Sequence, residues 1–222
     1  MKQVVLAGNA VTADILSVYL RSDPRYMLVG TTADDEFTGK GGPADVPSIG
    51  ISQLKGAFSP DDAVIIMAIG YDDLNRTRER IFHRLKGMGY TIETYIHPDA
   101  RVYTEHPIGE GCVILPAVVE PHVEIRENTM VWCNVTLAHH CRIAENCWIA
   151  SGAVVSGQAS IARNAFVGVN ATVVNEIEVG EFNIVGASAL ISKNTKANTV
   201  HLTRSGEQFR YSSEDYIRYF GV

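Results

Sequence analysis

Three histidines lie close together in the middle of the chain, at positions 122, 139 and 140. A neutral imidazole can take a proton at physiological pH, so a histidine at the surface can serve as a general base. Three imidazoles and a water molecule could instead hold a catalytic zinc ion. The ligand pair His-x-x-x-x-His does not occur in the sequence, so the sequence favours general-base chemistry and predicts no metal site.

The segment around these histidines is a repeat, because an aliphatic residue recurs at every sixth position. A period of six is neither helical nor simply alternating, and it predicts one short strand and one turn per hexapeptide, with three such units closing a coil. We expect the aliphatic residues to point inward and to stack on their equivalents in the coils before and after. The residues concerned are Ile125, Val131, Leu137, Ile143, Ile149, Val155, Ile161, Val167, Val173, Val179, Val185 and Ile191.

The repeat therefore predicts a parallel β-helix shaped as a prism, and it also predicts where His139 lies. His139 comes two positions after the inward-facing Leu137, at a turn where side chains project outward. Gly157 lies one coil further on, and we expect it to leave an open slot beside the imidazole. Small residues fill the corners of the coils, among them Cys112, Cys141 and Cys147, which we interpret as core residues.

The repeat slips once, because counting in steps of six from Ile114 leads to position 126, whereas the aliphatic residue is Ile125. We place the missing residue between Val119 and Val123. This places His122 in the same corner as His139, one coil earlier, and the column continues through Gly157 and Asn175.

The first part of the chain alternates strands with helices, which predicts a small Rossmann-like parallel sheet. Strands are expected at 4–8, 27–32 and 63–69, and helices at 13–20 and after Asp72 or Asp73, which could cap the second helix. The hexapeptide phase begins at His97-Pro98. We therefore predict an α/β domain at 1–96, an all-β parallel β-helix at 97–200 and a C-terminal tail at 201–222.

Ligands of such sheets bind beyond the carboxyl ends of the strands, which here are 8–12, 32–35 and 70–72. The first of these loops lacks the Gly-x-Gly-x-x-Gly pattern, and Val11 stands where a pyrophosphate would need glycine. A dinucleotide site for redox chemistry is therefore weakly supported.

The segment His139-His140-Cys141-Arg142-Ile143-Ala144 resembles a marker of one group of hexapeptide-repeat acyltransferases, the nucleotide-sugar N-acetyltransferases and sialic acid O-acetyltransferases. The resemblance implies a left-handed β-helix and makes His139 the general base. Many members carry an acidic residue next to the base, where this chain has His140. His140 is therefore expected to be a second catalytic residue, which could orient His139 in place of the acidic residue. Trp132 and Asn134, ahead of the histidines, resemble the branch that acts on nucleotide-linked 4-amino-4,6-dideoxy sugars.

The activity implied by this resemblance is direct transfer of an acetyl group from acetyl-CoA to the amino group of a nucleotide-linked sugar, in bacterial lipopolysaccharide O-antigen biosynthesis. O-acetylation of sialic acid or a related sugar is the alternative. A zinc hydratase of the γ-carbonic anhydrase type is more remote, as is a non-enzymatic nucleotide sensor. Acetyl-CoA is expected at Trp148, Gly157, Val169, Ala187 and Lys193. The acceptor is expected at Ala10, Val11, Thr12, Asp34, Asp35, Gly70 and Asn134.

Composition limits the partners. The chain has 222 residues, 46% of them hydrophobic, and a net charge of −6. A nucleic-acid partner would need a basic patch, and none is evident in the sequence. Neither a leader nor a membrane-spanning stretch is seen, so we expect a cytoplasmic protein. The flat faces of a prism favour a homotrimer. The aromatic tail is expected to cover the open end of the prism or a neighbouring subunit through Phe209, Tyr211, Tyr216, Ile217, Tyr219 and Phe220.

Overall fold

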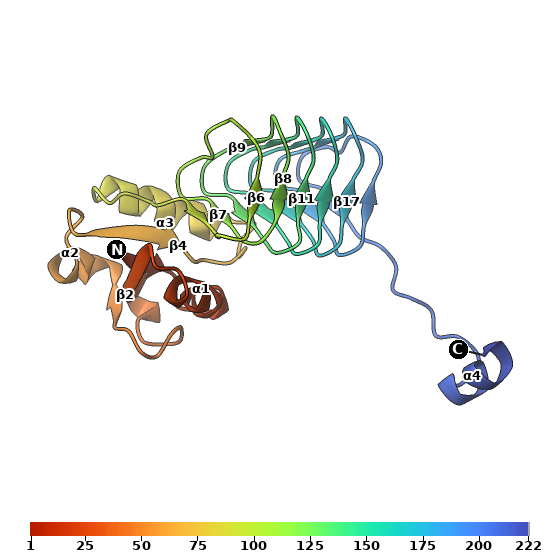
Figure 1. Cartoon of the computed structure of the whole chain (residues 1–222), viewed down its shortest axis with the longest axis horizontal. Coiled ribbons are helices and arrows are strands. Elements are labelled where there is room, and N and C mark those ends of the chain that lie inside the picture. The colour runs from red at the N-terminus through yellow and green to blue at the C-terminus, as the bar shows by residue number, and fades with distance from the viewer. Residues whose placement is uncertain (222) are drawn as a thin grey trace.

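The computed structural model describes residues 1–221 and contains a small α/β layer followed by a long β prism (Figure 1). Four parallel strands form the sheet of the first part, in the order β3-β2-β1-β4. Its elements are β1 (Lys2–Ala7), α1 (Val11–Arg21), β2 (Tyr26–Ala33), the 3-10 turn η1 (Asp35–Phe37), β3 (Ser48–Gly50), η2 (Ile51–Gln53), α2 (Leu54–Ala57), β4 (Ala63–Met67) and α3 (Arg76–Gly87). The predicted Rossmann-like sheet is confirmed.

The start of α3 differs from the prediction. The N-cap is Asn75 and not Asp72 or Asp73, because the chain makes a left-handed turn through Asp73, Leu74 and Asn75 before the helix begins. Asn75 is fully buried, and its amide nitrogen lies 3.4 Å from the carbonyl oxygen of Asn164 in the prism. The cap residue therefore helps to join the helix to the second part of the chain.

The prism is built from two-residue strands that stack into three parallel sheets, which we call faces 1, 2 and 3. Face 1 contains β5 (Tyr95–Ile96), β7 (Val113–Ile114), β10 (Met130–Val131), β13 (Trp148–Ile149), β16 (Phe166–Val167), β19 (Ile184–Val185) and β21 (Val200–His201). Face 2 contains β6 (Arg101–Val102), β8 (Val118–Val119), β11 (Thr136–Leu137), β14 (Val154–Val155), β17 (Thr172–Val173) and β20 (Leu190–Ile191). Face 3 contains β9 (Glu124–Ile125), β12 (Arg142–Ile143), β15 (Ser160–Ile161) and β18 (Glu178–Val179).

The second residue of each strand from β7 to β20 fills the interior of the prism, as the period of six predicts. All twelve predicted aliphatic positions are buried and belong to one hydrophobic core. Cys112, Cys141 and Cys147 are also fully buried in that core, which confirms that their thiols pack as small apolar groups.

The corners of the prism turn through residues in the left-handed region of φ, stacked in three columns. These columns are Asn128, Asn146, Asn164 and Phe182; Asn134, Gly152, Asn170 and Ser188; and His122, His140, Gln158 and Glu176. Asparagine and glycine adopt this conformation at lower cost than other residues, which explains why they dominate two of the columns.

The slip in the repeat lies in a different turn from the one predicted. Met130 pairs with Val113, and Thr136 pairs with Val118. Thr136 follows Met130 by one full hexapeptide, but Val118 follows Val113 by one position less. The short turn is therefore between Ile114 and Val118, and the predicted position between Val119 and Val123 is wrong. As a consequence His122 lies in the column of His140 and not in that of His139.

The α/β part packs against face 1, whose outward side chains Met130 and Trp148 join its hydrophobic core. The guanidinium of Arg78, on α3, is fully buried at this junction. It donates to the carbonyl oxygens of Asn146 at 2.9 Å and Gly70 at 3.0 Å, among other acceptors. Burial lowers the pKa of Arg78 to about 10, which still leaves the group charged at neutral pH.

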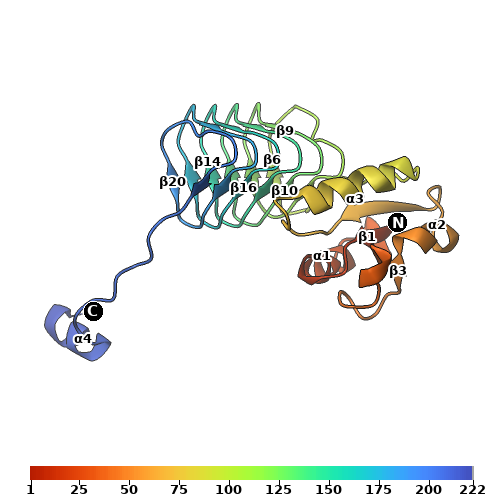
Figure 2. The ribbon, with the colours of Figure 1, turned by 180° about the vertical axis from the view of Figure 1, so that it is seen from behind.

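After β21 the chain leaves the prism and ends in helix α4 (Ser213–Phe220), which stands away from the body of the molecule (Figures 1 and 2). Its aromatic side chains contact each other, for example Tyr216 and Phe220 with ring centroids 4.7 Å apart. The prediction that the tail covers its own prism is therefore wrong for the single chain, and contact with a neighbouring subunit stays a prediction. Within residues 1–221 no helix is long and apolar enough to cross a membrane.

Candidate active site

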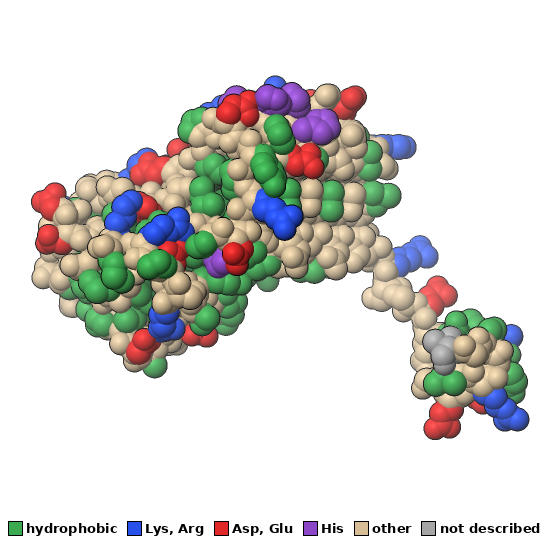
Figure 3. All heavy atoms as spheres, viewed as in Figure 1, with side chains coloured by type: hydrophobic (Ala, Val, Ile, Leu, Met, Phe, Trp, Pro, Cys, Tyr) green, Lys and Arg blue, Asp and Glu red, His purple; other side chains and the backbone are tan. Residues whose placement is uncertain are grey.

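His139 lies at the corner between faces 2 and 3, two residues after the end of β11, and its side chain is exposed. Leu137 and Cys141, both fully buried, anchor the turn from below. The backbone N–H of His139 donates to Oε2 of Glu120 at 2.8 Å, which ties the turn to the preceding coil. The predicted outward position of His139 is thus confirmed, and Figure 3 shows histidine side chains gathered along this corner.

His139 and His140 form a pair. Their Nδ1 atoms are 3.3 Å apart, and the rings meet edge to face with centroids 5.5 Å apart. A hydrogen bond at this distance requires one ring to donate and the other to accept, so the tautomers of the two imidazoles are linked. His140 has a φ of 60°, a conformation that a histidine adopts at a cost.

His122 supports this pair from the coil below. Its ring stacks on the ring of His140, with centroids 4.5 Å apart and an angle of 38° between the planes. Nδ1 of His122 contacts Oε1 of Glu105. The pKa of the Glu105 carboxyl is lowered, first by the backbone N–H of its own residue and then by the contacts with His122. At this corner Glu105 contacts His122, His122 stacks on His140, and His140 contacts His139.

Gly157 lies next to His139, as the column predicts. A Cβ added at this position would lie 2.6 Å from Cε1 and 2.7 Å from Nε2 of His139. The space above Gly157 is thus filled by the imidazole itself, and the open slot expected beside the ring is not what the structure contains. Position 157 must lack a side chain for His139 to take this orientation.

The residues predicted to bind acetyl-CoA fall into separate places. Val169 and Ala187 are both exposed and lie in consecutive coils at the corner between faces 1 and 2, and Lys193 is exposed after β20. Trp148 is only 5% exposed and packs against Tyr71 with ring centroids 5.2 Å apart. Face 2 separates Val169 and Ala187 from the His139 corner, so a ligand that reached both would have to cross that face.

The predicted acceptor residues partly gather around a pocket of about 360 Å³ at the carboxyl ends of β1, β2 and β4. Ala10, Asp34 and Gly70 line it. Val11 is 74% exposed and lies outside the lining, as does Thr12. The lining also includes polar residues that the sequence did not indicate as site residues, among them Asn9, Thr77 and Arg80.

The two acidic residues of this loop have different partners. Asp34 pairs with Arg80 and Arg84, each at 2.8 Å. Asp35 lies outside the lining and accepts a hydrogen bond from the backbone N–H of Ser52 at 3.1 Å, which lowers the pKa of its carboxyl. Asp35 therefore stabilises the loop. Arg80, which pairs with Asp34, is the cation of a pocket lining that also contains the carboxylates of Glu36 and Asp72. The sequence missed Arg80 because a surface arginine on an amphipathic helix has no distinguishing spacing.

Asn134, predicted to contact the sugar, is exposed at the corner between faces 1 and 2. It lines a hollow of about 370 Å³ with Thr136 of face 2 and Pro116, which lies in the turn between β7 and β8. The structure therefore does not bring Asn134 together with the other predicted acceptor residues. Within a single chain, the acceptor pocket and the His139 corner also have no lining residue in common among residues 1–221.

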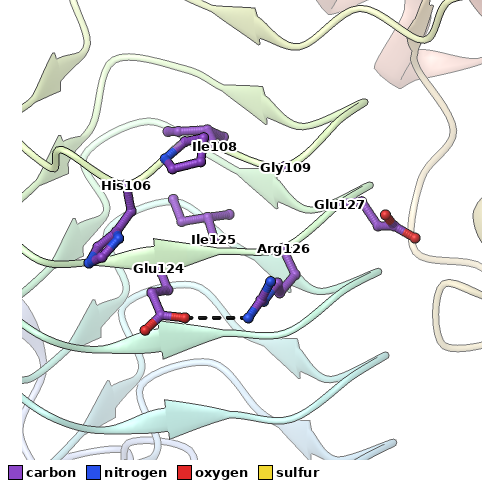
Figure 4. A pocket seen from close by; sticks show the side chains of 8 residues that line it. His106, Ile108, Gly109, Glu124, Ile125, Arg126 and Glu127 are labelled. Atoms are coloured by element: carbon purple, nitrogen blue, oxygen red, sulfur yellow. Dashed lines mark ion pairs between the residues drawn. The ribbon is translucent and has the colours of Figure 1, made fainter.

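A further hollow of about 440 Å³ opens at the start of face 3 and is lined by His106, Glu124 and Arg126 (Figure 4). Glu124 and Arg126 form an ion pair across it at 3.5 Å. His106 also forms an exposed group with Glu105 and His122. The side-chain atoms of this group that could bind a metal ion lie within 4.8 Å of one another. This group differs from the trio His122, His139 and His140 that a zinc hydratase would have used.

The comparisons with known proteins agree with this architecture. The bacterial transferase hexapeptide family (six repeats) matches residues 122–157, the stretch that contains His122, His139 and His140. No curated protein matches the chain. The acetyltransferase domain of PglB from Neisseria gonorrhoeae FA1090, solved in complex with acetyl coenzyme A, is 25% identical, with a TM-score of 0.77, and the alignment covers 90% of this chain and 95% of that one.

Two more distant structures share the fold. A variant of perosamine N-acetyltransferase from Caulobacter crescentus, in complex with CoA and GDP-perosamine, is 20% identical with a TM-score of 0.80, covering 93% of this chain and 98% of that one. WeeI from Acinetobacter baumannii AYE is 19% identical with a TM-score of 0.77, covering 90% and 95%. These matches confirm the predicted fold class, an α/β part followed by a left-handed β-helix. The family match over residues 122–157 and the structural matches together support a hexapeptide-repeat acyltransferase.

Proposed function

We propose that the protein transfers an acetyl group from acetyl-CoA to the amino group of a nucleotide-linked amino sugar, most suitably a 4-amino-4,6-dideoxy sugar. The observation that carries this proposal is the exposed pair His139 and His140, on a chain that matches an acetyl-CoA-bound acetyltransferase domain over 90% of its length. We propose that the reaction takes place in the cytoplasm, in the assembly of a surface polysaccharide such as the lipopolysaccharide O-antigen.

The chemistry requires one base. The amine nitrogen attacks the thioester carbonyl, a C–N bond forms, and the amine proton passes to Nε2 of His139. The C–S bond then breaks, and the CoA thiolate takes the proton from the imidazolium. We propose that transfer is direct, and the nearby Cys141 agrees with this, since burial raises the pKa of its thiol to about 12 and disfavours the nucleophilic thiolate at neutral pH. A backbone N–H near Gly157 is our candidate donor to the oxyanion.

The two substrates are assigned to different parts of the chain. The α/β part, residues 1–96, binds the nucleotide sugar, with Arg80 in the pocket as the phosphate partner. The prism, residues 97–200, binds acetyl-CoA across face 2, between Val169 and Ala187 at one corner and His139 at the other. The outward residues in the middle of that face, Val118, Thr136, Val154 and Thr172, are uncharged, which suits an extended ligand or a packed interface.

We propose that the protein is a homotrimer, in which the flat faces of the prism associate around a threefold axis. The acceptor pocket and His139 lie on separate parts of one chain, so a second copy has to supply the wall that brings acceptor and base together. Light scattering at micromolar concentration tests the oligomeric state, and a monomer would contradict this part of the proposal.

The activity is tested with a panel of nucleotide-linked amino sugars and acetyl-CoA, with the matching hydroxyl sugars as the control for O-acetylation. His139→Ala should lower kcat by about 10²- to 10⁴-fold while the Kd for CoA stays unchanged, since the imidazole acts on the acceptor proton. If His140→Ala is the more damaging variant, His140 is the base and the roles are reversed.

The substrate assignment has its own test. Arg80→Ala should raise KM for the nucleotide sugar and leave KM for acetyl-CoA unchanged, whereas Val169→Trp should do the reverse. A variant that raised both constants, or neither, would contradict the division of the chain into an acceptor part and a donor part.

A further inference from the structure

The first coil of the prism contributes no strand to face 3, and an irregular segment at residues 103–112 joins β6 to β7 instead. Two residues of this segment, Glu105 and His106, lie against His122 of the next coil, and all three side chains are exposed. We propose that Glu105, His106 and His122 form a binding site for a divalent transition-metal ion such as Zn²⁺, which links the irregular segment to the next coil. The site requires neither acetyl-CoA nor an acceptor, so it is independent of the proposed function.

The atoms that would bind the ion are already close together. One nitrogen of each imidazole and one oxygen of the carboxylate lie within 4.8 Å of one another. A tetrahedral zinc ion holds its ligand atoms about 3.4 Å apart, so small rotations of three exposed side chains complete the site. Within residues 1–221 no other three histidine, cysteine or acidic side chains bring their ligand atoms this close, and the trio His122, His139 and His140 does not.

The kinds of ligand indicate the kind of ion. Two imidazoles and one carboxylate are a ligand set that zinc takes in proteins, with a fourth position left for water. Imidazole nitrogen suits Zn²⁺, Co²⁺ and Ni²⁺, whereas Mg²⁺ and Ca²⁺ prefer oxygen ligands. The site should therefore select a transition metal over the more abundant Mg²⁺.

Hydrogen bonds hold the segment in the position that the site needs. The hydroxyl of Thr104 accepts from the backbone N–H of His106 at 3.2 Å and donates to the carbonyl oxygen of Val123 at 2.7 Å. Oε2 of Glu105 accepts from the backbone N–H of His122 at 3.3 Å, and Oε1 contacts Nδ1 of the same residue. An ordinary hydrogen bond explains the contact between Glu105 and His122. It does not explain why His106, whose ring has no hydrogen-bond partner among residues 1–221, is brought to the same point.

A nearby cation does not prevent binding. Arg126 lines the hollow that His106 borders, and a free guanidinium there would repel a metal ion (Figure 4). Arg126 is paired with Glu124 at 3.5 Å, so its charge is balanced in part.

A bound ion would strengthen a weakly held part of the prism. The backbone N–H groups of Tyr103 and Gly109 donate to the next coil, at 2.8 Å to Val119 and 2.9 Å to Ile125. Between these two hydrogen bonds the described contacts with the next coil pass through side chains, those of Thr104 and Glu105. A metal ion bound to both sides adds a cross-link there, and its binding free energy stabilises the folded segment.

The test measures binding of Zn²⁺ and Co²⁺ to the untagged full chain by isothermal titration calorimetry, after treatment with a chelator. We expect one ion per chain, and we expect His106→Ala and Glu105→Gln each to raise Kd by about tenfold or more. His83→Ala, which removes an exposed histidine of α3, is the matched control and should bind as the wild type does. His139→Ala should also keep the ion.

Loss of the ion in His139→Ala, with binding unchanged in His106→Ala, would place the metal on the trio and overturn the proposal. Equally weak binding in the wild type, His106→Ala and His83→Ala would mean adventitious binding to surface histidines only, and would overturn it as well.

Hydrogen exchange tests the cross-link itself. Saturating Zn²⁺ should slow amide exchange at residues 103–109 in the wild type and leave it unchanged in His106→Ala, and equal melting temperatures of the two metal-free proteins would show that the variant is folded. Unchanged exchange in the zinc-bound wild type would contradict the cross-link. None of these measurements uses enzyme activity, so their outcome is separate from that of the acetyl-transfer assay.

Discussion

The orientation of His139 depends on a residue that has no side chain. Its ring lies over Gly157 of the next coil, where a Cβ would approach Cε1 to 2.6 Å. The contact is with the ring of a side chain and not with backbone, so an added methyl group would move the imidazole before it moved the coil. The orientation of the His139 ring therefore depends on position 157, in the same corner of the following coil, having no side chain.

Gly157→Ala is therefore expected to lower kcat by about 10-fold or more, because a displacement of the base by about 1 Å is costly in catalysis. The melting temperature should change little, since an exposed ring can rotate away. Gly87→Ala, at a glycine with open space around it, serves as the control. Steady-state kinetics together with thermal melting measure both effects, and a variant with normal kcat would show that the ring does not need its present position.

At this scale the sequence predicted the exposed His139 and the buried thiols, because each depends only on its place within one hexapeptide. It misplaced His122 by one position. The slip between Ile114 and Ile125 is compatible with a short turn on either side of Val119, and only the strand pairing distinguishes the two. Arg80 was missed for another reason, since its role depends on which loops meet in space.

Aliphatic side chains and buried thiols fill the interior of the prism. Because the thiols can ionise, the free energy of unfolding depends on pH. Burial raises the pKa of Cys112, Cys141 and Cys147 from 9.0 to about 12. Since the folded pKa is above the unfolded one, the stabilisation is complete below pH 9 and is lost as pH rises toward 12.

Between pH 8 and 10 we expect each buried thiol to lower the free energy of unfolding by about 1 kcal/mol. Urea denaturation at these two pH values measures it. Cys147→Ala will be less stable at both, because it leaves a small cavity, but its loss between the two pH values should be smaller than that of the wild type. Equal losses would contradict the assignment to the thiols.

The left-handed corners can be tested with one exposed position. Glu176 has a φ of 62°, which a glutamate adopts at a cost and an asparagine adopts more easily. Glu176→Asn should raise the free energy of unfolding by about 0.5 kcal/mol, and the β-branched Glu176→Val should lower it. Chemical denaturation of the two variants decides, and an opposite order would show that this corner is not strained.

Among the elements, the prism was predictable because the aliphatic residue at every sixth position recurs many times along the chain. The sheet strands β1, β2 and β4 were predictable because they are apolar and buried. The short elements β3, α2 and α4 were not predicted, since brief segments of mixed polarity carry little periodicity. The tail was correctly singled out as aromatic, but its own contacts as helix α4 were not foreseen.

In the whole molecule, Arg78 connects the two parts of the chain. Its guanidinium donates to Gly70 at the edge of the acceptor pocket and to Asn128, Asn146 and Cys147 in the prism. Arg78→Met should destabilise the fold by about 3 kcal/mol or more, because it leaves several buried carbonyl groups without a donor. Arg76→Met, nearby on the same helix and exposed, should cost less than about 1 kcal/mol. Denaturation curves compare them, and similar losses would mean that the buried contacts of Arg78 are not specific.

The two ends of the prism are unequal. Near one end, the α/β part covers Met130 and Trp148 of face 1 and is hydrogen-bonded to the coils through Arg78. At the other end, the side chains of Leu190, Val200 and Leu202 are largely exposed. In a stack where each coil contacts only its neighbours, fraying begins at the uncovered end and advances coil by coil. The corner of His139 lies several coils from that end, so fraying of the last turns reaches Ala187 of the proposed acetyl-CoA site before it reaches the catalytic corner.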